Sequence, residues 1–234
     1  KAVAYNLNRG ARNLRFFEIG KVFYAGQDTM PREYPSICLA MTGKEKDYFW
    51  RDACPEYDFF DIKGVLEGFE TRFKVKFDFV KSNEPFLKEG RSADVLMERM
   101  KIGWVGEIED NILSIYNIEQ KVYCAELRFD IIMQKSITDI QYKAIPRYPQ
   151  VTRDFAFLVE DTVPVTTMLE QIKTISPLIT SIGVFDMFKK ETKSIALRVV
   201  FQSYEETLTD ETVNALQEII IQKVAGIPGV TLRT

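Results

Sequence analysis

The chain has 234 residues, of which 46% are hydrophobic, and this length and composition allow two globular domains of ordinary size. It contains no histidine, which excludes catalysis by a histidine base and metal sites built on histidine. The cysteines Cys38, Cys54 and Cys124 are widely spaced and form no CxxC pair, so we expect neither a disulfide framework nor a metal site, and a reducing cytoplasm as the location. The net charge of −3 gives no general attraction to nucleic acid, so binding to RNA would require a local patch.

The first residue of the chain and the length of its apolar runs indicate what kind of protein the sequence comes from. The chain opens on lysine, carries no apolar leader and has no apolar run that approaches the roughly 18 residues of a membrane span. We therefore expect a soluble piece of a longer protein with no membrane partner.

The first half of the chain predicts an α+β domain with a largely antiparallel sheet. Strands are expected at residues 14–24, 36–43, 75–81 and 121–129, with a hairpin over 93–109. Apolar residues at steps of three and four from Phe59 to Phe73 predict an amphipathic helix capped by Asp58, and a shorter helix is expected at 110–116. Weak periodicity and a proline at 146 indicate a linker at 134–146 between domains at 1–133 and 147–234.

The second half predicts a different arrangement. Strand 153–160 is followed by a helix at 165–175, strands at 180–188 and 193–202, a helix that begins after Thr209 and ends at Gly226, and a last strand at 230–233. This order is β-α-β-β-α-β, the ferredoxin-like split βαβ fold. Two helices cover one face of such a sheet, so its strands should alternate between a core face and an open face.

Charged residues near the open face allow two interpretations. In the first, Asp154 and Arg198 pair across adjacent strands and keep the face soluble. In the second, cationic side chains contact RNA phosphates or bases, and stacking aromatics are available only if Phe185 or Phe188 projects from this face. The candidate RNA-binding residues are Arg153, Lys189, Lys190, Lys193, Arg198 and Arg233.

The first domain offers no comparable site. Glu107 and Glu109 share one face of a strand end, and we interpret them as a solvated edge because nothing nearby indicates a substrate pocket. The sequence indicates no catalytic residue and no metal ligand.

An ordered series of motifs resembles the later part of the β subunit of bacterial phenylalanyl-tRNA synthetase. In the second domain the motifs are RDF at 153–155, VFD at 184–186, KSIA at 193–196, FQ at 201–202 and TLTDE at 207–211. In the first domain they are NLNR at 6–9, LRFFEIG at 14–20, DFFDIKG at 58–64 and GRSA at 90–93. The resemblance covers essentially the whole chain.

The resemblance implies a fold and a role for each domain. The first domain would be a catalytic-like domain related to class II synthetases, and the second a ferredoxin-fold domain that binds the tRNA anticodon region. The partners would be a catalytic α subunit, in an α2β2 tetramer, and phenylalanine tRNA. ATP and magnesium would be used by the whole enzyme and neither would be held by this chain. An alternative from another class is a ferredoxin-like regulatory module that binds a free amino acid between paired copies.

Overall fold

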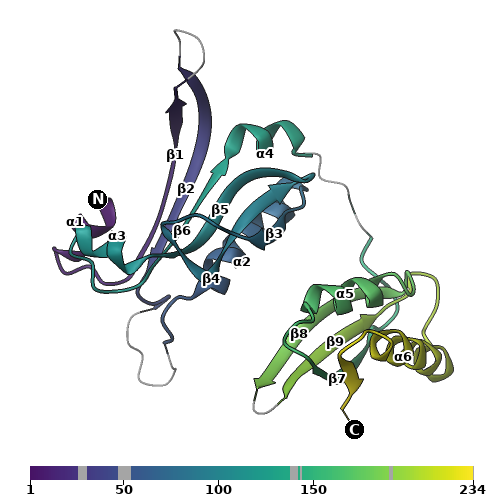
Figure 1. Cartoon of the computed structure of the whole chain (residues 1–234). Helices are drawn as coiled ribbons and strands as arrows, with labels where there is room; N and C mark the ends of the chain where they lie inside the picture. Colours follow the sequence, from purple (N-terminus) through teal and green to yellow (C-terminus); the bar gives the residue numbers. More distant parts are fainter. Residues whose placement is uncertain (26–30, 47–53, 138–141, 143, 190–191, 234) are drawn as a thin grey trace. The chain divides into compact units, whose positions relative to one another are not determined.

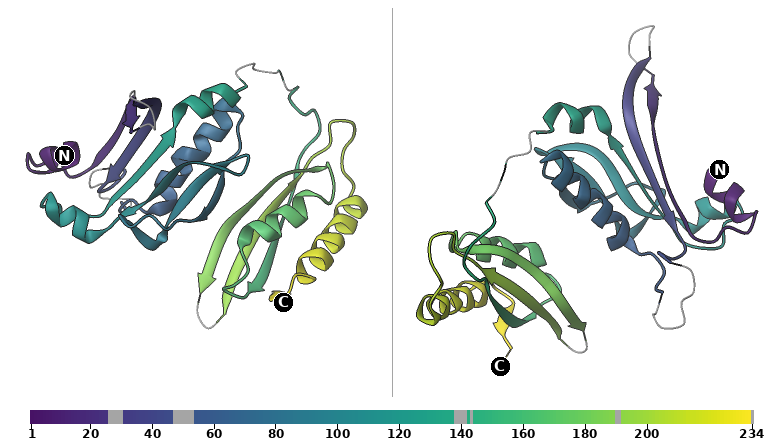
Figure 2. Two further views of the ribbon diagram at one scale, coloured as in Figure 1. Left: turned by 45° about the horizontal axis from the view of Figure 1, so that its top comes forward. Right: turned by 180° about the vertical axis from the view of Figure 1, so that it is seen from behind.

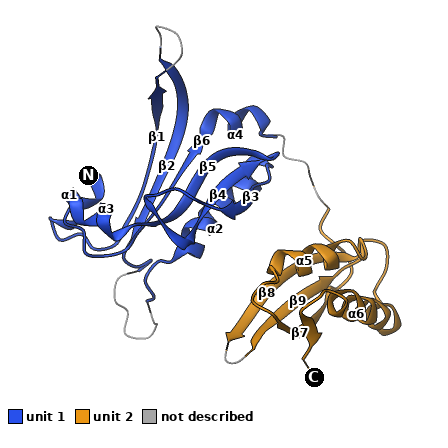
Figure 3. Cartoon of the chain, viewed as in Figure 1, with its two compact units in different colours: residues 1–140 blue, residues 141–234 orange. Residues whose placement is uncertain are grey.

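The structure is a computed structural model, and it describes residues 1–25, 31–46, 54–137, 142, 144–189 and 192–233. The chain divides into two compact units, residues 1–140 (unit 1) and 141–234 (unit 2) (Figure 3). Each unit has a sheet and a hydrophobic core of its own. The predicted linker at 134–146 begins inside a helix that ends at Lys135, and its residues 138–141 and 143 lie outside the described residues.

Unit 1 is built on a six-stranded antiparallel sheet in the order β1-β2-β6-β5-β4-β3, as far as the structure describes it (Figure 1). The strands are β1 (Leu14–Tyr24), β2 (Arg32–Thr42), β3 (Asp78–Lys81), β4 (Leu87–Met97), β5 (Met100–Ile108) and β6 (Val122–Arg128). The expected hairpin is present: β4 and β5 are joined at Glu98 and Arg99, which both take positive φ angles.

The helices of unit 1 are α1 (Ala2–Leu7), α2 (Phe59–Phe73), α3 (Asp110–Ile115) and α4 (Phe129–Lys135) in the described part of the chain. Helix α2 lies against one face of the sheet and buries Ile62 and Leu66 completely in the core. The predicted cap is confirmed, because the Asp58 carboxylate accepts hydrogen bonds from the backbone N–H groups of Phe60 and Asp61, while the Asp61 carboxylate accepts one from the backbone N–H of Asp58. Helices α1 and α4 were not predicted.

Unit 2 has the predicted split βαβ order. Its elements are β7 (Val151–Val159), α5 (Val165–Lys173), β8 (Ile179–Lys189), β9 (Lys193–Phe201), α6 (Asp210–Ala225) and β10 (Val230–Leu232). All pairings in the sheet are antiparallel and the strand order is β10-β7-β9-β8. Thr209 caps α6 by accepting a hydrogen bond from the N–H of Thr212, as its position predicted.

The core of unit 2 lies between one face of the sheet and both helices. Phe157 in β7 and Leu197 in β9 are fully buried, as are Met168 of α5 and Val213 and Ile220 of α6. Figure 2 shows α5 and α6 on the same side of this sheet. The predicted alternation is therefore confirmed, and the opposite face of the sheet, which we call the open face, is left without a covering helix among the described residues.

Candidate nucleic-acid interface

The open face of unit 2 carries a cation, a carboxylate and an aromatic ring in contact. Asp154 in β7 lies directly opposite Arg198 in β9, and the Arg198 Nε and Nη2 donate to the two carboxylate oxygens at 2.8 and 2.7 Å. The guanidinium carbon also lies over the ring of Phe185, 4.6 Å from its centroid. The hydrogen bonds from Arg198 lower the pKa of Asp154 and those to Asp154 raise the pKa of Arg198, so the pair is charged at neutral pH.

A second group lies further along the same face. The Arg233 Nη1 donates to the Ser194 hydroxyl at 3.2 Å, and the Arg233 backbone N–H donates to the carbonyl of Ala156. Phe188 in β8 lies directly opposite Ser194 and is exposed. Two predicted residues, Arg198 and Arg233, are thus brought to the open face, and the aromatic side chains that the sequence left undecided accompany them.

The other predicted residues lie at the ends of the strands. Arg153 has the parity of the core and its guanidinium forms an ion pair with Asp210, at the start of α6, at 3.5 Å. Lys189 and Lys193 lie opposite each other at the far end of the β8–β9 hairpin, and the Lys189 Nζ contacts the Asp161 carboxylate at 2.5 Å. Lys190 lies outside the described residues.

Strand β8 gives this region an apolar character that charge patterns do not show. It forms one edge of the sheet, and its second half exposes Val184, Phe185, Met187 and Phe188, with exposed fractions between 44% and 61%. The register shifts between Val184 and Asp186, so Phe185 has no directly opposed partner in β9 and can lie beside Arg198. A bulge of this kind cannot be located from alternation alone.

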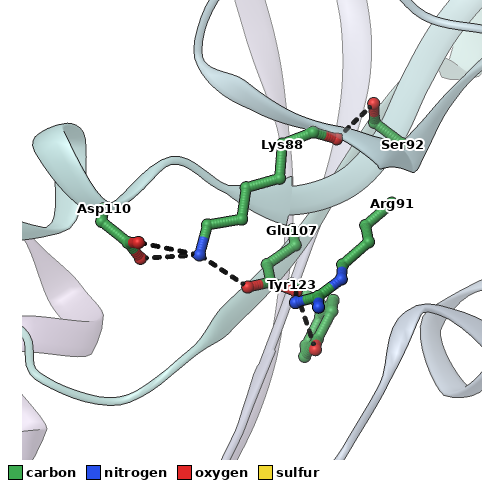
Figure 4. A network of polar contacts seen from close by, with 6 residues as sticks. All are labelled: Lys88, Arg91, Ser92, Glu107, Asp110 and Tyr123. Atoms are coloured by element: carbon green, nitrogen blue, oxygen red, sulfur yellow. Dashed lines mark hydrogen bonds and ion pairs between the residues drawn. The ribbon is translucent and has the colours of Figure 1, made fainter.

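Unit 1 contains a buried charge network in place of the solvated edge expected at Glu107 (Figure 4). The Glu107 side chain is 1% exposed, and one of its oxygens receives hydrogen bonds from Arg91 at 2.9 Å and from the Tyr123 hydroxyl at 3.1 Å. Lys88 approaches the other oxygen at 3.1 Å and also contacts Asp110. The expectation was wrong because Glu107 shares its sheet face with core residues of β6, so its carboxylate points into the unit.

The network sets the protonation states of its members. Burial alone would raise the pKa of Glu107, but the hydrogen bonds from Arg91, Lys88 and Tyr123 outweigh it and lower the pKa. Burial first, and then the charge of Glu107, raise the pKa of Tyr123 to about 12. The carboxylate is therefore ionised and the phenol protonated at neutral pH, as a structural network requires.

The sheet of unit 1 also carries a cleft of about 730 Å³. It lies on the side turned away from α2, because its lining residues Ser36 and Glu126 alternate with residues of the core. Lys101 pairs with Glu84 and Asp94, and Arg128 pairs with Asp130 and stacks on a tyrosine ring. Among its charged lining residues, Glu84, Lys101 and Arg128 are thus engaged in ion pairs.

The residues that the structure describes contain no group of three or more histidine, cysteine, aspartate or glutamate side chains that could hold a metal ion. Among their helices, none is long and apolar enough to cross a membrane.

Comparison with known proteins decides the family. Residues 1–129 match the family model of the phenylalanyl-tRNA synthetase beta chain CLM domain, and residues 146–233 match the ferredoxin-fold anticodon binding domain. The chain belongs to the phenylalanyl-tRNA synthetase beta chain family. The resemblance found in the motifs is confirmed at this level, and so are an α+β fold with antiparallel sheets and a ferredoxin-fold second unit.

The curated relatives are much longer than the chain itself. The phenylalanine–tRNA ligase beta subunit of Staphylococcus saprophyticus is 33% identical over 239 residues, which cover 99% of this chain and 30% of the relative. That of Staphylococcus epidermidis is 34% identical over 228 residues, which cover 94% of this chain and 28% of the relative. The chain thus spans about 30% of the length of these relatives. Among solved structures, the pyrrolysyl-tRNA synthetase of Desulfitobacterium hafniense matches with a TM-score of 0.42 at 12% identity, over 56% of this chain and 45% of that one.

Proposed function

We propose that the chain is a non-catalytic part of a phenylalanine–tRNA ligase β subunit in the cytoplasm. Unit 1 supports the catalytic α subunit, and unit 2 binds the anticodon region of phenylalanine tRNA during phenylalanyl-tRNA synthesis. The observation that carries this proposal is the match of both units, in order and over nearly the whole chain, to beta subunits of this ligase. The active site, with ATP and magnesium, belongs to the whole enzyme, an α2β2 tetramer, and we assign no residue of this chain to it.

The open face of unit 2 supports the RNA-binding part of the proposal. Arg198, Arg233, Phe185 and Phe188 share this face or its β8 edge, and cations interleaved with exposed aromatic rings are what unpaired RNA binds. Lys189 and Lys193 stand at the end of the same hairpin and would contact the phosphate backbone. Arg153 lies on the helix side, so we assign it a contact at the sheet margin and not on the open face.

The test is the binding of the full chain to phenylalanine tRNA and to the same tRNA with a changed anticodon, measured over a series of salt concentrations. We expect weaker binding to the changed tRNA, and affinity that falls steeply with salt because phosphate contacts release counterions. Equal, salt-independent binding to both RNAs would overturn the proposal. Saturable binding of free phenylalanine without RNA binding would instead favour the regulatory module that the split βαβ fold also allows.

The first strand of unit 1 offers a surface for the α subunit. Strand β1 is an edge strand, and Phe17, Ile19 and Phe23 project from the same side of it with exposed fractions of 73%, 53% and 61%. Three large exposed apolar side chains on one side of an edge strand, with Lys21 between Ile19 and Phe23, are typical of a surface that another chain covers. We propose that this strip packs on α, and that unit 1 has a class II synthetase-like fold without catalytic activity.

Co-purification with the α subunit of a relative tests this surface. Replacing Phe17 and Phe23 by serine should abolish co-elution while the chain remains folded, because both side chains are already exposed in the isolated chain. The matched control replaces Val80 and Met100 by serine. Both side chains are exposed elsewhere in unit 1, so co-elution should be unchanged. Loss of co-elution in the control alone would place the α surface elsewhere.

A further inference from the structure

The guanidinium of Arg198 is fixed in one plane by its neighbours. Asp154 accepts from its Nε and Nη2 in a two-point contact, with distances of 2.8 and 2.7 Å, and Phe185 lies against the guanidinium from β8. Both partners stand on strands that pair with β9, so the sheet itself sets their positions. The Arg198 side chain nevertheless remains 50% exposed, which leaves part of the planar group open to a ligand.

This arrangement suits a flat ligand better than a phosphate. The carboxylate of Asp154 neutralises the positive charge that would attract a phosphate. It also occupies Nε and Nη2, the pair of donors through which arginine usually binds a phosphate. What remains is the side of the guanidinium plane turned away from Phe185, together with the N–H groups of Nη1. Arginine planes stack on unpaired bases, and bases carry acceptors at their edges.

Beside Arg198, the open face carries small side chains over which a base could lie. The next pair along the open face is Ala156 opposite Ala196, and both are small side chains. The pair after that is Leu158 opposite Ser194, and the Ser194 hydroxyl accepts a hydrogen bond from the Arg233 side chain. Along β7 and β9, the two alanines therefore lie between Arg198 and the serine that Arg233 contacts.

We infer that Arg198 binds RNA as a stacking platform for one unpaired nucleobase, held flat by Asp154 and Phe185, and not as a phosphate-binding charge. The inference rests on the proposed RNA-binding function and specifies the ligand group at this position. It makes Asp154 and Phe185 positioning residues for the base. Arg233 provides the contrast, since no carboxylate lies within ion-pair distance of it among the described residues, and it is suited to a phosphate.

Matched charge-preserving substitutions test the inference with an anticodon stem-loop RNA and the full chain. Lysine keeps the charge but loses the plane, so Arg198→Lys should weaken binding by about 5- to 150-fold, the loss expected for one stacked base. Arg233→Lys should keep affinity within about threefold, because a lysine ammonium also binds a phosphate, as a point charge. Circular dichroism spectra identical to that of the unmodified chain would establish that both variants are folded.

An abasic series through the loop identifies the base and separates stacking from any structural effect. Removing one particular base while keeping its phosphate should weaken binding to the unmodified chain, and the same removal should cost the Arg198→Lys variant nothing. If Arg198→Lys binds like the unmodified chain, or if every abasic RNA loses equally in both proteins, the inference is overturned while the proposed function stands. If the unmodified chain binds no stem-loop, the proposed function fails and the inference with it.

Discussion

Replacing Glu107 by alanine should destabilise unit 1 by about 3 kcal/mol. The Glu107 side chain is 1% exposed and its substitution leaves the Tyr123 hydroxyl buried without an acceptor, which costs about 1–3 kcal/mol. The lost charged hydrogen bonds add to this, since hydrogen bonds to charged groups contribute about 1.5–3 kcal/mol each. The total stays at the low end of the 3–5 kcal/mol typical of a broken buried pair, because Lys88 keeps Asp110 and the Arg91 side chain is 54% exposed.

Tryptophan fluorescence during urea unfolding measures this effect in unit 1 alone. The two tryptophans, Trp50 and Trp104, both precede residue 141, so unit 2 contributes no tryptophan signal. With a slope of about 2 kcal/mol per molar urea, the midpoint should fall by about 1.5 M. Tyr123→Phe is the matched control and should cost only about 0.5–1.5 kcal/mol, because it removes the hydroxyl that needs the acceptor.

Two further measurements are the stability of the double variant, Glu107→Ala with Tyr123→Phe, and the pH dependence of the Glu107→Ala effect. Because Tyr123→Phe leaves no orphan hydroxyl, the two substitutions together should cost at least about 1 kcal/mol less than their sum. Since the pKa of Glu107 is lowered in the folded state, its contribution is complete above its unfolded pKa of about 4.3 and is lost as pH falls through the folded value. The cost of the alanine substitution should therefore shrink below about pH 4. Strict additivity and a loss under about 1 kcal/mol at pH 7 would refute this account of the network.

Two further predictions concern glycines and the second core. Gly103→Ala should destabilise unit 1 by more than about 2 kcal/mol in the same fluorescence assay, because the added methyl group would lie 1.9 Å from the Glu126 carbonyl oxygen. Gly64→Ala in α2 is the control, because its methyl group meets no atom, and it should stabilise unit 1 by about 0.5–1 kcal/mol. Equal effects of the two substitutions would contradict the packing at Gly103. Phe157→Ala should cost unit 2 about 3–5 kcal/mol, measured by far-ultraviolet circular dichroism, since the ring is fully buried; a loss under about 1 kcal/mol would show that the core closes over the cavity.

The sequence predicted those parts of the fold in which a local signal and the hydrophobic period agree. In unit 2, the apolar alternation through Phe155 and Phe157 and the cap at Thr209 each mark their element, and the β-α-β-β-α-β order follows from them. Helix α4 carried no such signal. Strand β6 passes into it directly at Arg128, whose side chain makes no cap hydrogen bond, so no capping or turn residue marks the boundary between the two elements.

The candidate sites show a different limit. Alternation correctly placed Asp154 and Arg198 together, because both strands are regular and the pair is in register. It could not place Phe185, which stands at a register shift. Glu107 has the same parity as the buried Val105 in β5, but its donors come from β4 and β6, so alternation alone could not show that its charge is paired inside the unit.

The arginine–carboxylate contacts at Glu107 and at Asp154 differ in function because they differ in burial. The Glu107 side chain is 1% exposed, so its pairing contributes to the stability of unit 1, and removing it leaves the Tyr123 hydroxyl buried without its acceptor. Asp154 and Arg198 are each about half exposed, so water can replace either partner and the pair adds little to stability. What the exposed pair does supply is orientation, since two hydrogen bonds fix a planar group that would otherwise rotate. A substitution at Arg198 should therefore alter RNA binding without altering the unfolding midpoint, and a substitution at Glu107 should do the reverse.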